Sequence, residues 1–176
     1  VTNPAIKGTS LDKGLTPGEK QADVRARETA AASATAKQNE QENKMRDDFT
    51  KASTDFVKVR DAHQRVIESA ADPSAAGDLA LIFNYMKVLD PGSTVREGEF
   101  ATAQNSGGID SRVIAMYNKV LQGERLAPKV RDDFVDRSGR LYTGAVKNQE
   151  KIEGDYDTKA KAAGVRPTQV VTKHRI

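Results

Sequence analysis

The stretch "MRDDFTKASTDFVKVRDAHQRV", residues 45–66, carries the pattern that decides the fold. Its apolar and aromatic positions recur at alternating spacings of four and three. They are Met45, Phe49, Ala52, Phe56, Val59, His63 and Val66. This alternation is a heptad seam of about three repeats, typical of a helix that packs lengthwise on a partner helix. At His63, a packed histidine with one ring nitrogen reaching solvent is favoured over a functional titrating site.

The same helix is expected to begin far upstream of the seam. In "TPGE", Thr16 can cap the helix, Pro17 suits its first position, and Glu19 completes a capping box. No later proline or glycine interrupts the chain before the next turn, so residues 16–71 are predicted to form one helix of roughly 75–80 Å. Residues 1–15 contain proline and glycine among polar residues, which predicts an extended arm.

The first half of this long helix differs from the seam. Between residues 24 and 38 the apolar side chains are nearly all alanine. Alanine is too small to build a core within one chain, although it has the highest helix propensity. This half is therefore expected either to fray or to pack on neighbouring copies.

Residues 72–126 are predicted to form a small cap of about three short helices. The turn "ADPSAAGD" ends the long helix, and Ser74 or Asp78 can cap the next one. That helix, "DLALIFNYMKVL", is apolar almost all round and should be buried. "DPGS" favours a type II turn with Gly92 at positive φ, and short helices over "STVREGEFATAQ" and residues 110–121 follow. The expected core residues of the cap are Leu81, Ile82, Tyr85, Leu89, Val113, Ile114, Tyr117, Val120 and Leu121.

A second long helix is predicted over residues 127–164, with Pro128 at an early position and Gly164 as the stop. Its expected apolar stripe is Val130, Phe134, Leu141, Tyr142, Ala145, Ile152 and Tyr156. Two long helices that flank a compact apolar middle predict an all-α fold. The expected architecture is a long antiparallel helical hairpin, or stalk, with the small cap at its closed end.

The composition is that of long solvated helices. Only 37% of the 176 residues are hydrophobic and 5% are aromatic, which is a lean core for this length. The net charge of +3 comes mostly from residues 165–176, a basic C-terminal tail with Arg166, Lys173 and Arg175 and no acidic residue. Contact of this tail with DNA is one interpretation, and a disordered cationic end is the alternative.

No constellation in the sequence indicates catalysis. Glu97 and Glu99 are two positions apart, so on a helix they point roughly 200° away from each other and cannot act as a pair. Their place in a first helical turn suits the positive end of the helix dipole. The chain has no cysteine and two histidines, and it lacks phosphate-loop and nucleophile-elbow motifs. No catalytic residue, no metal site, no cofactor and no small-molecule substrate are therefore expected.

Several segments carry a resemblance to a known class of proteins. The pieces "AAGDLALIFNYMKVLDPGS", "VREGEFATAQN" and "GERL", with the preceding "DFVKVRDAHQRV", resemble segments of tailed-bacteriophage virion proteins. These are internal or ejected proteins and large structural polypeptides, sometimes fused to peptidoglycan-cleaving domains. The resemblance covers roughly residues 49–164, and no catalytic residue is attached to it.

The resemblance implies a non-enzymatic, oligomeric component of the phage particle, either internal and ejected or tail-associated, that acts in genome delivery. Its implied location is the virion, with delivery into the host cell envelope during infection left open. Its implied partners are further copies of itself and other virion proteins, such as portal, tail or internal proteins. Two alternatives remain: a helical accessory segment of a virion-associated peptidoglycan-degrading enzyme, and a cellular coiled-coil adaptor.

A homo-oligomer is the expected assembly, and the resemblance to virion components implies a cyclic one rather than a simple dimer. Residues 18–44 of the first helix and the strand-like C-terminal "TQVVTKHRI" are its predicted contact regions. The candidate contact residues are Val24, Ala30, Ala34, Arg166, Val170, Val171, Lys173 and Arg175.

Overall fold

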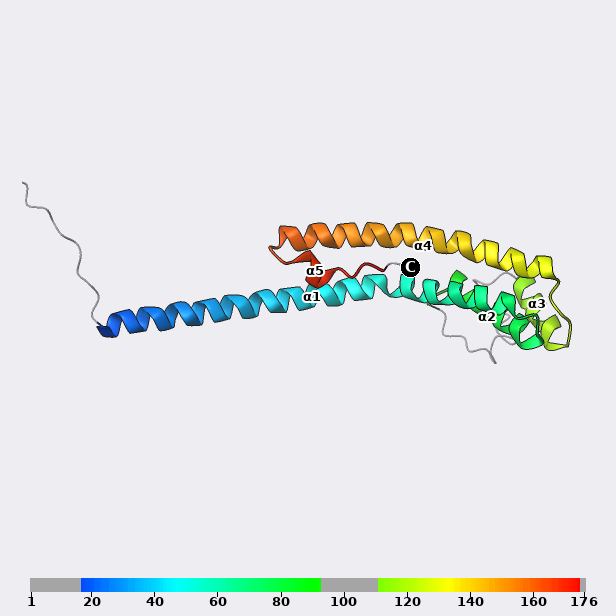
Figure 1. Ribbon diagram of the computed structural model, residues 1–176, viewed down its shortest axis with the longest axis horizontal. Coiled ribbons are helices and arrows are strands. Elements are labelled where there is room, and N and C mark those ends of the chain that lie inside the picture. Colours follow the sequence, from blue (N-terminus) through cyan, green and yellow to red (C-terminus); the bar gives the residue numbers. More distant parts are fainter. Residues whose placement is uncertain (1–16, 93–110, 175–176) are drawn as a thin grey trace, which may run out of the picture. The chain divides into compact units, whose positions relative to one another are not determined.

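The computed structural model describes residues 17–92 and 111–174, and every regular element in these ranges is a helix (Figure 1). The all-α prediction is thus confirmed for the described part of the chain. The five helices are α1 (Pro17–Ala71), α2 (Ala75–Leu89), α3 (Ser111–Leu121), α4 (Pro128–Ala162) and α5 (Pro167–Val170). The predicted extended arm, the predicted Thr16 cap, the predicted helix with Glu97 and Glu99, and the candidate contact residue Arg175 all lie outside the described residues.

The chain divides into two units within helix α1, one ending at Gln41 and one beginning at Glu42. In the first unit, every side chain from residue 24 to residue 41 is exposed. Side-chain contacts in this unit include the local ion pair of Arg27 with Asp23 at 2.9 Å. The second unit holds the apolar cores.

The larger core gathers side chains from residues 59–66 of α1, from α2 and α3, and from the start of α4. Val66, Leu81 and Ile82 are fully buried, and the Tyr85 ring meets the Phe134 ring edge-on at 4.8 Å between centroids. Burial of Leu81, Ile82 and Tyr85 in α2 confirms the apolar helix prediction. At about 25 cal/mol per Å² of apolar surface, this cluster is the main source of stability in the second unit.

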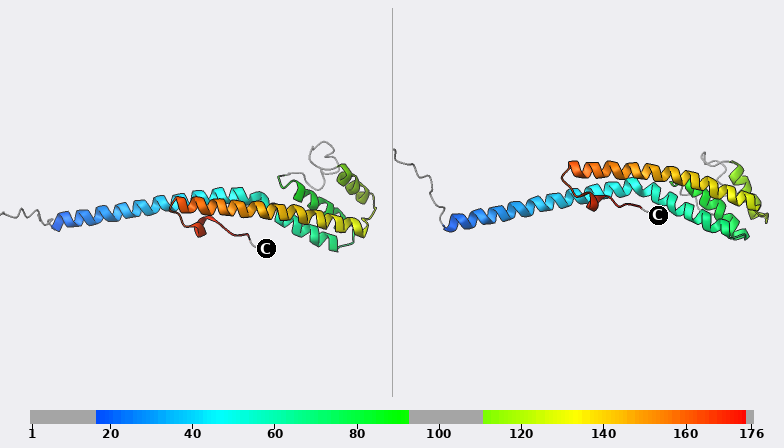
Figure 2. Two further views of the ribbon diagram at one scale, coloured as in Figure 1. Left: turned by 90° about the horizontal axis from the view of Figure 1, so that it is seen from above. Right: turned by 45° about the horizontal axis from the view of Figure 1, so that its top comes forward.

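Helix α4 lies alongside the part of α1 that follows Gln41 (Figures 1 and 2). Side-chain contacts that join the two helices include Phe49 with Tyr156, Ser53 with Gln149, Phe56 with Tyr142, and His63 with Ser138. The seam predicted from sequence is therefore correct in period. It is wrong at Ala52, which is exposed, because the buried Ser53 occupies that place and accepts a hydrogen bond from Gln149.

Three leucines expected in the core are instead exposed. Leu89 and Leu121 are the last residues of their helices, where the chain turns away from the core. Leu141 lies at the edge of the α4 stripe, whose centre passes through the buried polar residues Ser138 and Gln149. Their exposed fractions are 37% for Leu89, 51% for Leu121 and 41% for Leu141.

The helix ends follow local rules at most positions. Pro128 opens α4 after Ala127, and Gly164 follows its end with φ +69°, the left-handed conformation typical of a helix stop. The type II prediction at Gly92 is wrong, because Gly92 is not in the left-handed region. Its N–H instead donates to the Asp90 side chain at 3.2 Å, which closes the turn locally.

Candidate interaction site

The C-terminal segment, residues 166–174, packs against both α1 and α4 in the second unit (Figure 1). It begins just after the stop of α4, where the Val165 N–H reaches back to the Ala160 carbonyl at 2.9 Å. Residues 167–170 form the short helix α5, so the strand-like prediction is wrong there. Pro167 stands at the first position of this single turn, where its fixed φ suits a helix, and the strand-like interpretation did not take it into account.

Polar contacts fix the start of the segment on α1. The Arg166 guanidinium lies 3.3 Å from the Glu42 carboxylate, which is buried although the arginine remains largely exposed. One turn along α1, Arg46 Nε donates to the Gln169 carbonyl at 2.6 Å. The basic side chain of Arg166 meets a carboxylate, and the carbonyl of Gln169 meets a guanidinium. The segment is therefore electrostatically complementary to the surface of α1 that holds it.

Apolar and aromatic contacts fix the rest of the segment. Val170 is 1% exposed and packs in a second core cluster with Phe49, Ala160 and Val165. The His174 ring lies 6.3 Å from the Phe49 ring and 5.8 Å from the Phe56 ring, centroid to centroid. We call this surface the tail groove; it is formed by Glu42, Met45, Arg46, Phe49 and Phe56 of α1 and by Ile152, Glu153, Tyr156 and Ala160 of α4.

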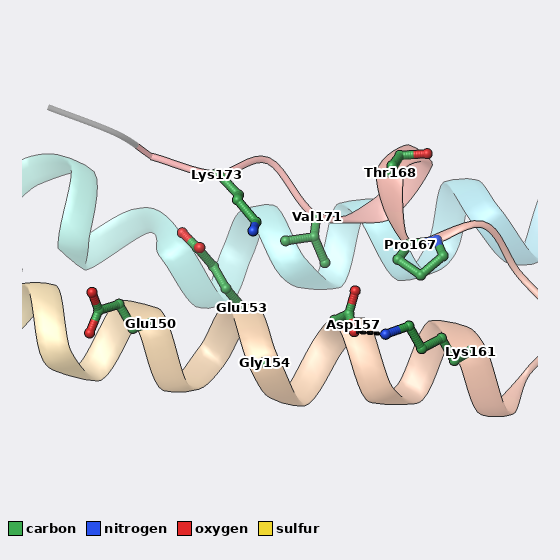
Figure 3. Close-up of a pocket in the computed structure, with 9 residues that line it drawn as sticks. All are labelled: Glu150, Glu153, Gly154, Asp157, Lys161, Pro167, Thr168, Val171 and Lys173. Carbon is green, nitrogen blue, oxygen red and sulfur yellow. Dashed lines mark ion pairs between the residues drawn. The ribbon is translucent and has the colours of Figure 1, made fainter.

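A pocket of about 580 Å³ opens between the segment and α4 (Figure 3). Three carboxylates of α4 line it, Glu150, Glu153 and Asp157, together with Lys161 of α4, which pairs with Asp157 at 2.6 Å, and Lys173 of the segment. Glu153 also accepts the His174 backbone N–H at 3.3 Å. The α4 side of the groove is therefore acidic where the basic segment crosses it.

The structure separates the predicted contact residues into two sets. Arg166, Val170, Val171 and Lys173 lie on the segment that occupies the tail groove, where they contact their own chain. Val24, Ala30 and Ala34 are exposed on the first unit, with Val24 52% exposed. Sequence reasoning missed the receiving side of the groove, although the buried acid Glu42 at the start of the seam was a signal for it.

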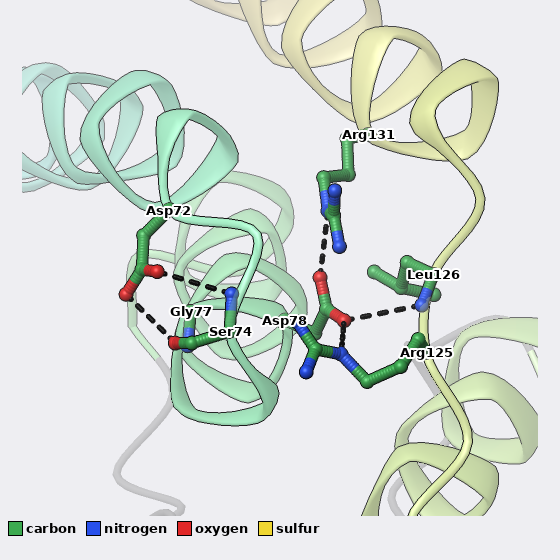
Figure 4. A network of polar contacts seen from close by, with 7 residues as sticks. All are labelled: Asp72, Ser74, Gly77, Asp78, Arg125, Leu126 and Arg131. Atoms are coloured by element: carbon green, nitrogen blue, oxygen red, sulfur yellow. Dashed lines mark hydrogen bonds and ion pairs between the residues drawn. The ribbon is translucent and has the colours of Figure 1, made fainter.

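The buried carboxylate of Asp78 is the most connected polar group that sequence reasoning missed (Figure 4). It accepts hydrogen bonds from Arg131 Nε at 2.7 Å, Arg125 Nε at 3.1 Å and the Leu126 N–H at 3.1 Å. Of the two caps that the sequence offers for α2, Ser74 is confirmed, because its hydroxyl accepts from Gly77 N–H, and Asp78 is not a cap. Asp78 instead ties α2 to the loop before α4 and to the first turn of α4.

The protonation of Asp78 follows from these contacts. Burial by itself would raise the pKa of Asp78, but the hydrogen bonds from Arg131, Leu126 and Arg125 outweigh it and hold the pKa below its usual value. The same contact raises the pKa of Arg131. Both groups stay charged at neutral pH, and each compensates the burial of the other.

A second polar cluster joins α1 and α4 around His63. His63 Nδ1 lies 3.0 Å from the hydroxyl of the fully buried Ser138, and the His63 ring stacks on Tyr142 at 4.8 Å. Burial lowers the pKa of His63 and raises the pKa of Tyr142. Ser138 also donates to the Val135 carbonyl at 2.9 Å, so its proton is held by the backbone. A serine buried between helices in this way is a packing contact, consistent with the interpretation of His63 as a seam residue.

Within residues 17–92 and 111–174, no group of three or more histidine and acidic side chains is placed to hold a metal ion. The helices in the same ranges include none with an apolar stretch long enough to cross a bilayer. The chain matches no model of a known protein family, and comparisons with characterised proteins and with solved structures give no significant match.

Proposed function

We propose that this chain is a non-enzymatic component of a tailed-bacteriophage particle, an internal or ejected protein or a tail-associated structural protein. It acts in genome delivery through oligomeric assembly with its own copies, in a cyclic arrangement, and with other virion proteins. The sequence resemblance suggests the particle. The observation that carries the assembly is the helix over residues 17–41, in which every side chain from residue 24 onward is exposed.

A long exposed helix needs a partner to be strongly stable. Isolated helices gain little beyond propensity, and most helix stability in proteins comes from burying one face. Alanines on such a helix permit close approach of a second helix, while each buries too little surface to hold the helix on one neighbour. Several copies that share this surface would offset the cost of ordering it.

The second unit supplies the rigid part of the proposed assembly. We propose that residues 42–71 and α4 form an antiparallel hairpin, with α2 and α3 as its cap. The order of the contacts between α1 and α4 supports this arrangement, because Phe49 pairs with Tyr156 while His63 pairs with Ser138. Contact of the C-terminal segment with viral DNA would require the Arg166–Glu42 pair to open.

Analytical ultracentrifugation of the full chain tests the assembly. Ala30→Lys with Ala34→Lys keeps helix propensity and blocks close helix approach, so this variant should sediment as a monomer where the unchanged chain is an oligomer. The matched control is Ala52→Lys, an exposed alanine of the same helix outside the predicted contact set. If the double variant and the unchanged chain sediment alike, residues 17–41 are not the interface.

Mass spectrometry of purified phage particles tests the location. Many copies of the chain per particle would support the structural role. A chain found only as part of a longer polypeptide with a peptidoglycan-cleaving domain would favour the accessory segment. Absence from the particle would refute both.

A further inference from the structure

The tail groove has the features of a peptide-binding site. Its occupant, residues 166–174, contributes one buried apolar anchor, Val170, and one basic side chain, Arg166, that meets a buried carboxylate. The groove surrounds this segment with contacts from both α1 and α4. A short segment held by side chains of two helices is bound in the same way whichever chain supplies it.

The segment follows directly on the end of helix α4. Helix α4 ends in a hydrogen-bonded stop at Gly164 and Val165, with Gly164 N–H bonded to Lys161 and Val165 N–H to Ala160. The Val165 side chain is buried, so this stop is anchored. The segment therefore departs from a fixed point, and rotation at residue 166 alone would direct it to another molecule without disturbing α4.

A buried polar atom near the segment lacks a hydrogen-bond partner among the described residues. Gln149 is 2% exposed, its Nε2 donates to Ser53, and its Oε1 has no hydrogen-bond partner among the described residues. Gln149 lines a second pocket, of about 460 Å³, together with Phe56, Lys173 and His174. A buried acceptor without a donor costs free energy, and this cost is the same whichever copy supplies the segment.

We propose that the tail groove binds residues 166–174 of a second copy of the chain, so that neighbouring copies exchange their C-terminal segments. Within one chain the segment is held at high effective concentration, so exchange prevails where copies are crowded. This inference rests on the proposed oligomeric assembly, which brings the copies together. Exchange of an identical element creates the same contacts between chains as within one chain, and therefore costs little.

A pair of charge reversals tests the exchange. Glu42→Arg places a cation in the groove against the native Arg166, and Arg166→Glu places an anion on the segment against the native Glu42. Neither variant can form the ion pair within one chain or between two copies of the same variant. In a mixture, each groove finds a segment of opposite charge on the other variant, so both pairs form only by reciprocal exchange.

Resonance energy transfer reads out the mixed complex. The chain has no cysteine, so Leu141→Cys, at an exposed position of α4, gives a single labelling site in each variant. Assembly through residues 17–41 contributes equally to all mixtures. We expect higher transfer in the complementary mixture than in either variant mixed with itself. Equal transfer in the three mixtures would overturn the proposal.

The control chain carries both reversals. Glu42→Arg with Arg166→Glu in one molecule restores the pair internally, so its unfolding midpoint should recover what each single reversal loses. This recovery shows that the ion pair, and not damage to α1, is responsible for the behaviour of the single variants.

A second measurement uses a variant of the segment and leaves the groove residues unchanged. Val170→Glu in the full chain should dislodge the segment, because it places a charge in the apolar cluster. A fluorescent peptide of residues 166–174 should then bind this variant about tenfold more tightly than the unchanged chain, whose own segment competes. Equal binding of the peptide to both chains, or binding to neither, would refute the groove as a site for a segment from another molecule.

The outcomes separate this inference from the proposed function. If the unchanged chain is an oligomer but the complementary mixture shows no added transfer, assembly stands and exchange fails. If the mixture pairs while Ala30→Lys with Ala34→Lys has no effect on sedimentation, exchange stands and the role of residues 17–41 fails.

Discussion

The two parts of helix α1 have the same secondary structure for different physical reasons. Residues 17–41 are rich in alanine and charged residues, and their side chains are exposed. Residues 42–71 bury a continuous stripe that includes Phe49, Phe56 and Val66. The first part is helical through propensity, which supplies at most a few tenths of a kcal/mol per residue, whereas the second is helical through packing as well.

This difference teaches that helix content alone is a poor guide to where stability resides. Substitutions in the packed unit should lower the free energy of unfolding by whole kcal/mol, while substitutions in residues 17–41 should alter only local helix content.

The largest effect is expected at Asp78. Asp78→Ala leaves the Arg131 guanidinium, whose side chain is 11% exposed, and the Leu126 N–H without their partner. Breaking a buried ion pair by removing one member costs about 3–5 kcal/mol, which urea unfolding followed by circular dichroism would measure. Asp136→Ala, at an exposed position of α4, is the control and should change stability by less than about 0.5 kcal/mol. An Asp78 variant as stable as this control would show that the network contributes nothing.

A core leucine and an exposed valine give the next contrast. Leu81 is fully buried, so Leu81→Ala should cost roughly 2–5 kcal/mol through lost burial and a cavity. Val24 is 52% exposed, so Val24→Ala should change the unfolding free energy by less than about 0.5 kcal/mol. Similar shifts for both variants in thermal unfolding would contradict the division between packed and exposed helix.

Gly77 and Gly18 differ in how much space surrounds them, which gives a further contrast between the packed and the exposed helix. A Cβ at Gly77 would overlap the Asp72 carbonyl oxygen, so Gly77→Ala should destabilise by about 1–3 kcal/mol. A Cβ at Gly18 would meet nothing within 4 Å, so Gly18→Ala should raise local helix content, by up to about 1 kcal/mol in propensity. Denaturant unfolding and amide hydrogen exchange distinguish these results. A neutral Gly77→Ala would mean that α2 can move away from Asp72.

The smallest effect is expected from pH at His63. Burial holds the pKa of His63 below its ordinary value of 6.5. As the pH falls below 6.5, the folded protein therefore binds fewer protons than the unfolded chain. The stability that His63 contributes is therefore complete above pH 6.5 and declines as the pH drops toward its folded pKa. His63→Gln should flatten the dependence of the unfolding midpoint between about pH 7.5 and 5. An unchanged slope in this variant would assign the dependence to other groups.

Local chemistry explains how much of the fold was predictable. The four-and-three spacing of residues 45–66, the Ser74 cap, the Pro128 start and the Gly164 stop each depend on neighbours within one or two turns. Such rules act through backbone geometry and helix periodicity, so they can be read without knowing the partner. The failures at Leu89 and Leu121 arose at helix ends, where periodicity cannot tell which way the chain turns.

The sequence by itself determined the helical class, the period of the seam and the contrast between the alanine-rich and packed parts of α1. Only the tertiary structure decided that Asp78 joins residues more than 45 positions away, that Ser53 and Gln149 take the centre of the seam, and that residues 166–174 return to a groove. Helix formation is governed by contacts three or four residues apart, which the order of residues displays. The partner of a buried polar group is selected by desolvation and geometry between distant segments, and these exist only after the chain has folded.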